Sequence, residues 1–491
     1  MSPAIIILTL VGYVALLFVV AWRASRGVSS ESFFTGGRTT HRAVAAVAMV
    51  GAAMSGVTYI SVPGTVAADG FSYLQTCLGF LVGYAIIAYV LIPLYYRLGV
   101  VSLYEYLDHR FGIVAHRTGA WFFFLSKIAS ASLRAYVICV VLQGLLYDLY
   151  DIPFAVNAAI MMSLVWLYTR RGGVRSVVWV ETLKTFVMVA SIVMCITFVV
   201  RALDMNLGEA VGSIARSDYS QVLFFDDPLD RRYFWKQFLA GIFLVVAMTG
   251  LDQDMMQTVL SCPTRRDAQR GMMSSIALQI VVITLFLALG ALLYIYTSQR
   301  GVDAPQGDML FGYVATECGL PIVVGILFIL GLVASTYSSA GSALTALTTS
   351  FTLDLLGGRR ADDAKGEQLD RRRRLSHTLI AVAMTAIIVA FNYWSTAGAI
   401  TLIFTMASYT YGPLLGLFVF GLASHRMPHP RAIPVVAILS PLASYVIASN
   451  SRVWLAGYEF SYDILILNTA LTLLGLWLSS LGRTASSRSK E

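Results

Sequence analysis

The residues with the clearest chemical potential in this chain are hydroxyl side chains that crowd an otherwise apolar stretch. Residues 331–354, GLVASTYSSAGSALTALTTSFTLD, carry ten Ser or Thr residues and a single charge, Asp354, at the end. The stretch is long enough for a helix that crosses a membrane. Because residues three and four apart share a helical face, one polar stripe forms from Ser335, Ser338, Ser339, Ser342 and Thr345 or Thr349.

These hydroxyls can serve two purposes. Over residues 345–352 we expect them to bond back to the i−4 carbonyls or to let helices pack closely. Earlier in the stretch, Ser335 and Thr336 follow the Leu332 carbonyl by one turn. Such a cluster of uncharged oxygens suits a small hard cation such as Na⁺. A single helix cannot supply all the ligands of that cation, so a second source of oxygen is needed.

A broken helix is the second source that the sequence offers. Residues 51–64 read GAAMSGVTYISVPG. Gly51 and Gly56 allow the helix to break between them, and the carbonyls of the unwound residues are then free and point inward. Ala-Met-Ser-Gly at 53–56 returns as Ala-Met-Thr-Gly at 247–250. Glycine-interrupted helices at matching places in two inverted halves indicate a transporter binding site. Glycine that serves only close helix packing is the alternative.

Charged residues inside apolar spans are costly and usually functional. Arg134 can hold a carboxylate through two parallel hydrogen bonds, or it can form an internal ion pair with Asp252 or Glu181. Asp252, beside the second break, can meet a substrate amine or hydroxyl or answer Arg134. The full set of such residues is Lys127, Arg134, Glu181, Lys184, Asp252 and Asp254.

The surrounding elements that must position these groups are membrane helices. Of the 491 residues, 57% are hydrophobic and 13% are charged, about half the charged fraction of a soluble chain. Apolar runs predict an all-α protein with about thirteen spans. They lie near 4–22, 43–68, 74–99, 118–147, 153–169, 176–201, 235–260, 272–297, 321–355, 376–393, 397–423, 431–449 and 461–482.

Basic residues predict how the chain is oriented. Arg23 and Arg26 follow the first span instead of preceding it, which is the reverse of a secretory signal. Most of the 35 Lys and Arg residues fall in loops that are cytoplasmic if the N-terminus lies outside and the C-terminus inside. The net charge of +8 therefore reflects membrane topology, and we do not expect nucleic acid as a partner.

Other function classes find little support. The five cysteines have no CxxC spacing, and the six histidines form no HExxH motif, so neither a disulfide nor a zinc framework is predicted. An intramembrane enzyme would need a paired acid and base or a metal cluster in the spans, and we predict no enzyme. A sodium sensor or channel-like relative without coupled transport stays open as the alternative to a transporter.

Four motifs in order, GAAMSGVTYISVPG, GGVRSVVWVETLK, GLDQDMMQTVLSCPTRRDAQRG and ASTYSSAGSALTALTTSFTLDLL, resemble the sodium:solute symporter family over roughly residues 5–425. The resemblance implies Na⁺-driven uptake of a small organic solute, which can bear a carboxylate, by alternating access. It also implies a multi-pass protein of the cytoplasmic membrane, with no obligatory protein partner. The implied LeuT-type five-plus-five core has a peripheral helix at 1–22, inverted repeats at 43–201 and 235–423, and peripheral helices with a short tail at 424–491.

The resemblance also carries ligand positions. The family's Na⁺ ligands fall on the carbonyls of Gly51, Met54 and Leu332 and on the hydroxyls of Ser335 and Thr336, in agreement with the oxygen cluster described above.

Some family members have a second Na⁺ position, which would use Ser338, Ser339 and an acid, here Glu181 where Asp is usual. Lys184 stands where the family has Gln, and a lysine there can replace a cation. The proline-transporting branch has an acid where this chain has Ala53, which argues against proline.

Substrate contacts implied by the resemblance are less specific. Arg134 resembles an arginine of sialic-acid-type members, and Asp252 stands where Asn is frequent. Monocarboxylates, sugars, sialic acids, amino acids and vitamins all occur as substrates in the family, and the sequence does not choose among them. The expected contacts are Ser55, Thr58, Phe71, Gln75, Arg134, Asp252 and Gln253.

The Na⁺ prediction can be tested by titration. We expect Ser335→Ala and Thr336→Ala each to raise the Na⁺ concentration needed for half-maximal uptake, because each removes one ligand oxygen. Uptake measured against Na⁺ concentration checks this, and an unchanged sodium curve in both variants would count against the site.

Overall fold

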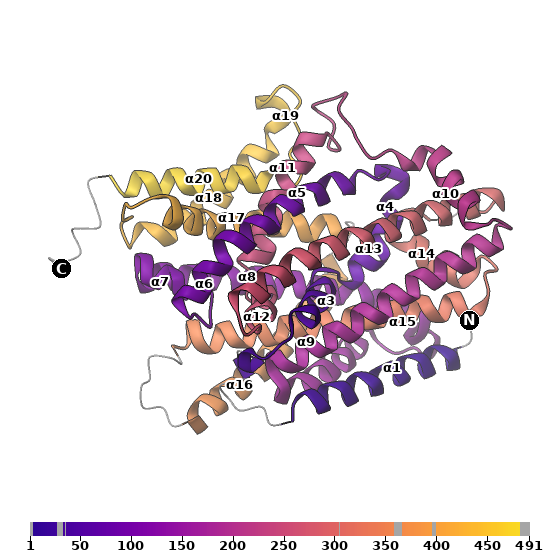
Figure 1. Ribbon diagram of the computed structural model, residues 1–491, viewed down its shortest axis with the longest axis horizontal. Coiled ribbons are helices and arrows are strands. Elements are labelled where there is room, and N and C mark those ends of the chain that lie inside the picture. The colour runs from indigo at the N-terminus through magenta and orange to yellow at the C-terminus, as the bar shows by residue number, and fades with distance from the viewer. Residues whose placement is uncertain are drawn as a thin grey trace.

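The computed structural model describes residues 3–26, 33–34, 36–303, 305–357, 366–394 and 399–481, and these contain helices and loops but no strand. Nine helices within these ranges are long and apolar enough to cross a membrane, and two bent pairs pass the same test together. Shorter apolar helices lie at Phe154–Arg170 and Ile464–Ser479. The long helices run side by side in one bundle (Figure 1). The all-α prediction is confirmed, while the exact count of thirteen spans stays a prediction.

The first half of the chain contains the helices up to α10. They are α1 (Pro3–Ala24), α3 (Arg42–Ala53), α4 (Gly56–Asp69), α5 (Tyr73–Ile86), α6 (Ile92–Leu98), α7 (Glu105–Phe111), α8 (Ile113–Leu142), α9 (Phe154–Ala202) and α10 (Leu207–Arg216).

The rest of the chain contains the helices from α11 onward. They are α11 (Phe234–Val245), α12 (Gln253–Leu260), α13 (Arg265–Gln299), α14 (Leu310–Glu317), α15 (Ile322–Ser350), α16 (Gly366–Trp394), α17 (Ala399–Ala423), α18 (Ala432–Ser449), α19 (Ser451–Trp454) and α20 (Ile464–Ser479).

The first bent pair is formed by α3 and α4, whose axes differ by 62°. Met54 and Ser55 between them adopt extended backbone conformations, so the helical hydrogen-bond ladder is interrupted there. The Ser55 N–H donates to Thr58 Oγ1 at 3.3 Å, which caps the new helix. The predicted break between Gly51 and Gly56 is therefore confirmed.

The second bent pair lies at the matching place in the other half of the chain. A π-helical turn at Val246–Gly250 extends α11, and α12 then starts at Gln253 with a bend of 68°. Asp252 is extended, and its Oδ1 accepts a hydrogen bond from the Asp254 N–H at 2.9 Å. This side chain therefore caps α12. The expected break beside Asp252 is also confirmed.

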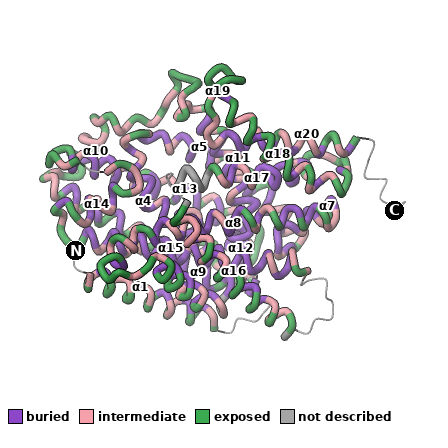
Figure 2. Tube along the Cα trace, turned by 180° about the vertical axis from the view of Figure 1, so that it is seen from behind, coloured by how far each residue is buried: buried purple, intermediate pink, exposed green. Residues whose placement is uncertain are grey.

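Helix α15, which carries the hydroxyl stripe, is the most enclosed of the nine spans. It contacts α1, α3, α4, α8, α9, α12, α14 and α16. Viewed by burial, the exposed residues gather on outer elements such as α1, α10 and α19 (Figure 2).

The second part of the hydroxyl stripe bonds within its own helix. Thr345, Thr348 and Thr349 donate to the carbonyls four residues earlier at 2.9, 2.7 and 3.0 Å. These three hydroxyls bond back as expected. Ser350 donates instead to Asp354 Oδ2 at 2.9 Å, and Thr352 Oγ1 has no hydrogen-bond partner among the described residues.

Close packing of α15 against α9 depends on a small residue. A Cβ added at Gly341 would lie 1.7 Å from the Tyr168 hydroxyl oxygen, and that hydroxyl donates to the Tyr337 carbonyl at 2.6 Å. Gly341→Ala should therefore displace the tyrosine and destabilise the protein by about 1–3 kcal/mol through overpacking. Thermal unfolding in detergent measures this. Gly12→Ala, where a Cβ meets nothing within 4 Å, is the control, and equal melting temperatures would refute the packing account.

Candidate functional site

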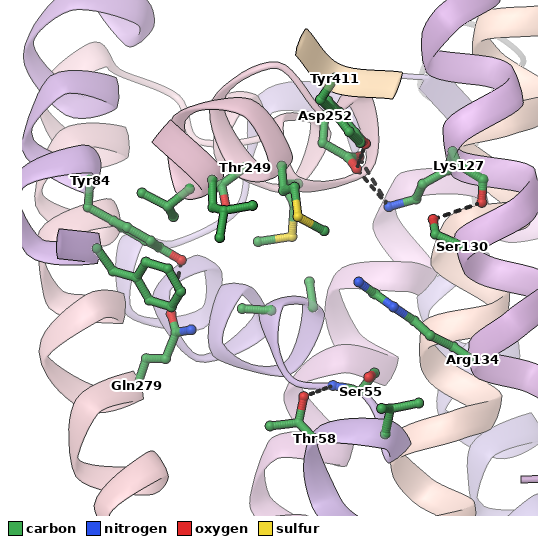
Figure 3. A pocket seen from close by; sticks show the side chains of 18 of the residues that line it. Ser55, Thr58, Tyr84, Lys127, Ser130, Arg134, Thr249, Asp252, Gln279 and Tyr411 are labelled. Carbon is green, nitrogen blue, oxygen red and sulfur yellow. Dashed lines mark hydrogen bonds and ion pairs between the residues drawn. The ribbon is translucent and has the colours of Figure 1, made fainter. Parts of the chain in front are cut away.

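A cavity of about 100 Å³ lies between the two helix breaks. The walls come from α3, α4, α5, α8, α11, α13 and α17 together with the second break. Figure 3 shows the polar side chains that face it, namely Ser55, Thr58, Tyr84, Lys127, Ser130, Arg134, Thr249, Asp252, Gln279 and Tyr411.

One side of the cavity holds a buried ionic cluster. Lys127 Nζ on α8 lies 3.0 Å from Asp252 Oδ2 and 2.8 Å from Asp254 Oδ2. Tyr411 donates to Asp252 Oδ2 at 2.8 Å, and Ser342 donates to Asp254 Oδ2 at 3.3 Å. Buried charges are tolerated when they are paired and hydrogen-bonded in this way. The lysine thus bridges two carboxylates around the second break.

Arg134 is left without either of its expected acidic partners. Asp252 pairs with Lys127, and Glu181 pairs with Lys184. Within the ranges that the structure describes, Arg134 forms no ion pair, and its buried Nε has no hydrogen-bond partner. Its guanidinium points into the cavity below Lys127 (Figure 3). A charged fork-shaped donor is therefore available to a molecule in the cavity.

The expected Na⁺ ligands are all buried. Ser335 Oγ and Thr336 Oγ1 donate to the Leu332 carbonyl at 2.9 and 2.7 Å, which gathers three oxygens on one turn of α15. Gly51 and Met54 lie at the end of α3, where the Gly51 carbonyl also accepts a hydrogen bond from the Met54 N–H at 3.2 Å.

The break and the hydroxyl cluster meet in space. A Cβ added at Gly56 would lie 2.8 Å from Thr336 Oγ1 and 2.4 Å from Ile138 Cδ1. The first residue of α4 therefore lies against α15 and α8, and a larger residue there would require one of these side chains to move. Main-chain carbonyls and hydroxyls, all uncharged oxygens, are the donor set that a hard monovalent cation accepts. The residues present thus fit Na⁺ between the α3–α4 break and α15.

A second charged pair lies next to this oxygen cluster. Lys184 Nζ lies 3.1 Å from Glu181 Oε2, and it donates to Ser339 Oγ at 2.7 Å. Ser338 Oγ lies beside the same carboxylate, yet neither it nor Glu181 Oε1 reaches hydrogen-bond geometry with any residue that the structure describes. An ammonium therefore stands among the residues expected for a second Na⁺.

Three expected substrate contacts lie outside the cavity lining. Phe71 donates from its N–H to Gln221, and the Gln75 amide bonds main-chain groups of Phe224 and Arg232. Both therefore hold the loop before α11. The Gln253 amide bonds the main chain of residues 101 and 103, at the far end of the second break. Ser55, Thr58, Arg134 and Asp252 do line the cavity.

Several lining residues were not among the expected contacts. Tyr84 donates to Gln279 Oε1 at 3.0 Å across the cavity wall, and Thr249 lies in the second break. Lys127 has a sequence signal, because it is a charge within an apolar span. Tyr411 has none, since a tyrosine in an apolar helix is ordinary.

One family model matches most of this chain. The model of the sodium:solute symporter family matches residues 33–438. Sodium-coupled monocarboxylate transporter 1 of Xenopus laevis is 26% identical over 80% of this chain and 63% of its own length. The human sodium/iodide cotransporter is 24% identical over 80% of this chain and 61% of its own. The chain thus spans less than two thirds of the length of these two relatives.

Two further comparisons cover nearly whole chains. The sodium/sialic acid symporter SiaT of Proteus mirabilis is 22% identical over 89% of this chain and 88% of its own. A solved structure of a Na⁺-coupled sialic acid symporter, substrate-bound and outward-open, superposes with a TM-score of 0.82 at 20% identity. It covers 97% of this chain and 98% of that chain, so the two share a fold.

We expect the buried ionic cluster around Lys127 to stabilise the fold. Lys127→Met would leave two buried carboxylates without their cation, and breaking a buried ion pair costs about 3–5 kcal/mol. We expect a large fall in melting temperature. Neutralising all three charges with Lys127→Met, Asp252→Asn and Asp254→Asn should recover most of it. A Lys127→Met protein as stable as the unmodified one would rule out a structural role for the cluster.

Proposed function

This chain belongs to the sodium:solute symporter family, and from that premise we propose that it couples Na⁺ entry to the uptake of a small organic carboxylate. The single observation that carries the substrate class is the unpartnered Arg134 guanidinium in the cavity. The observation that supports Na⁺ is the contact between the α3–α4 break and the α15 hydroxyls. The two features lie on either side of Ser55, which lines the cavity.

The Na⁺ ligands in this proposal are the carbonyls of Gly51, Met54 and Leu332 with the hydroxyls of Ser335 and Thr336. Their contribution is to replace the hydration shell of the ion with oxygens from two separate helices. A bound ion therefore ties α3 and α4 to α15. Moving one charge across 100 mV releases about 2.3 kcal/mol, which supplies part of the energy for uptake.

The carboxylate assignment follows from how the charged groups of the cavity are paired. Arg134 forms no ion pair among the described residues, and its buried Nε has no hydrogen-bond partner. Lys127 is already committed to both acids, so Arg134 remains to bind a substrate carboxylate through two parallel hydrogen bonds. Ser55, Thr58 and Ser130 offer hydroxyls to the rest of the solute. Two relatives named for monocarboxylate and for sialic acid support an organic acid as cargo.

Coupling between the ion and the solute rests on their shared helix break. Met54 belongs to the proposed ion site, and Ser55, the next residue, lines the cavity. An ion that fixes the break therefore also fixes one wall of the solute site. Residues 43–201 and 235–423 would form the inverted repeats that alternate access, with residues 1–22 and 424–491 peripheral. The N-terminus would lie outside and the C-terminus in the cytoplasm.

Arg134→Gln tests the substrate class. A thermal-shift screen of the purified protein against a metabolite panel, with and without Na⁺, first identifies a ligand. Loss of hydrogen bonds to a charged group costs about 1.5–3 kcal/mol, so KM for an acidic solute should rise roughly 10- to 100-fold. Na⁺ binding should persist. Equal loss of a neutral solute in Arg134→Gln would instead assign the arginine to the fold.

A further inference from the structure

We propose that the ammonium of Lys184 is a resident cation beside the sodium site, so that this transporter binds one Na⁺ per cycle. The inference rests on the proposed Na⁺/solute symport and adds its ion stoichiometry.

Lys184 lies in the interior of the helical bundle. Its side chain and that of Glu181 are fully buried, although lysine and glutamate are rarely buried so completely. The ammonium lies 3.1 Å from Glu181 Oε2 and donates to Ser339 Oγ at 2.7 Å. These partners are a carboxylate and a hydroxyl, the kinds of oxygen that a metal cation would use.

The Glu181–Lys184 pair touches both halves of the proposed Na⁺ site. A Cβ added at Gly51 would lie 2.8 Å from Glu181 Oε2, so the carboxylate is in contact with the end of α3. On the α15 side, Ser339 joins the pair to the stripe, because Ser339 Oγ donates to the Ser335 carbonyl at 2.8 Å. The Glu181 carboxylate therefore lies beside the proposed Na⁺ site, where its negative charge can bind a second cation.

Lys184 neutralises that carboxylate with an ammonium that is part of the chain, in place of a free metal ion. A buried carboxylate requires a paired cation, and an ammonium three residues along the same helix supplies one permanently. Glu181 Oε1 and Ser338 Oγ remain without partners in the described structure. These two oxygens, with Glu181 Oε2 and Ser339 Oγ, would surround a cation if the ammonium were removed.

Equilibrium binding of radioactive Na⁺ to the purified full-length protein counts the ions directly and needs no substrate. The unmodified protein should bind one Na⁺ per chain with a non-cooperative isotherm. Lys184→Met should bind two, because Glu181 is then free to hold a metal ion. The double variant Lys184→Met with Glu181→Gln, which has neither charge, should return to one.

The outcomes separate this inference from the proposed function. Two Na⁺ per unmodified chain would overturn the inference and leave Na⁺ coupling intact, and this holds even if Lys184→Met fails to fold. One Na⁺ in a folded Lys184→Met protein would also overturn it. No Na⁺ bound by the unmodified protein would instead reject the proposed function.

Discussion

Main-chain oxygens released by a broken membrane helix are the constraint on which this structure depends. The bilayer offers them no hydrogen-bond partners, so such a break persists only where protein, water or an ion satisfies it. Here the break at Met54 and Ser55 is pressed against α15 through Gly56. The hydroxyl stripe of α15 is the complementary surface. Its small side chains allow close approach, and its first turn adds oxygens of the same kind as those of the break.

The buried charges of the same region pair with one another, except for one. Lys127 neutralises the two acids of the second break, and Lys184 neutralises Glu181. Both pairings leave Arg134 as the cavity's available cation among the residues described. A site arranged in this way has an uncharged place for a cation and a charged place for an anion. We infer that the distribution of lysines decides how many ions and which solutes enter.

Sequence patterns predicted the helices, the two breaks and the hydroxyl cluster, because each rests on local composition or on an internal repeat. Pairing of charges could not be predicted in the same way. Lys127 meets Asp252, which lies 125 residues away, and only the tertiary fold brings these two side chains together. The same reason applies to Gln75 and Gln253, whose amides bond distant loops and do not line the cavity. No local sequence pattern marks Tyr411 as a lining residue.

The central claim is that one Na⁺ is held between the α3–α4 break and α15. A high-resolution experimental structure in Na⁺, compared with one in choline, tests it most directly. The account predicts a Na⁺-dependent density peak at about 2.3–2.6 Å from the carbonyl of Met54 and the hydroxyls of Ser335 and Thr336. Apolar packing across that gap, or an ion bound at Glu181 with this position vacant, would contradict it.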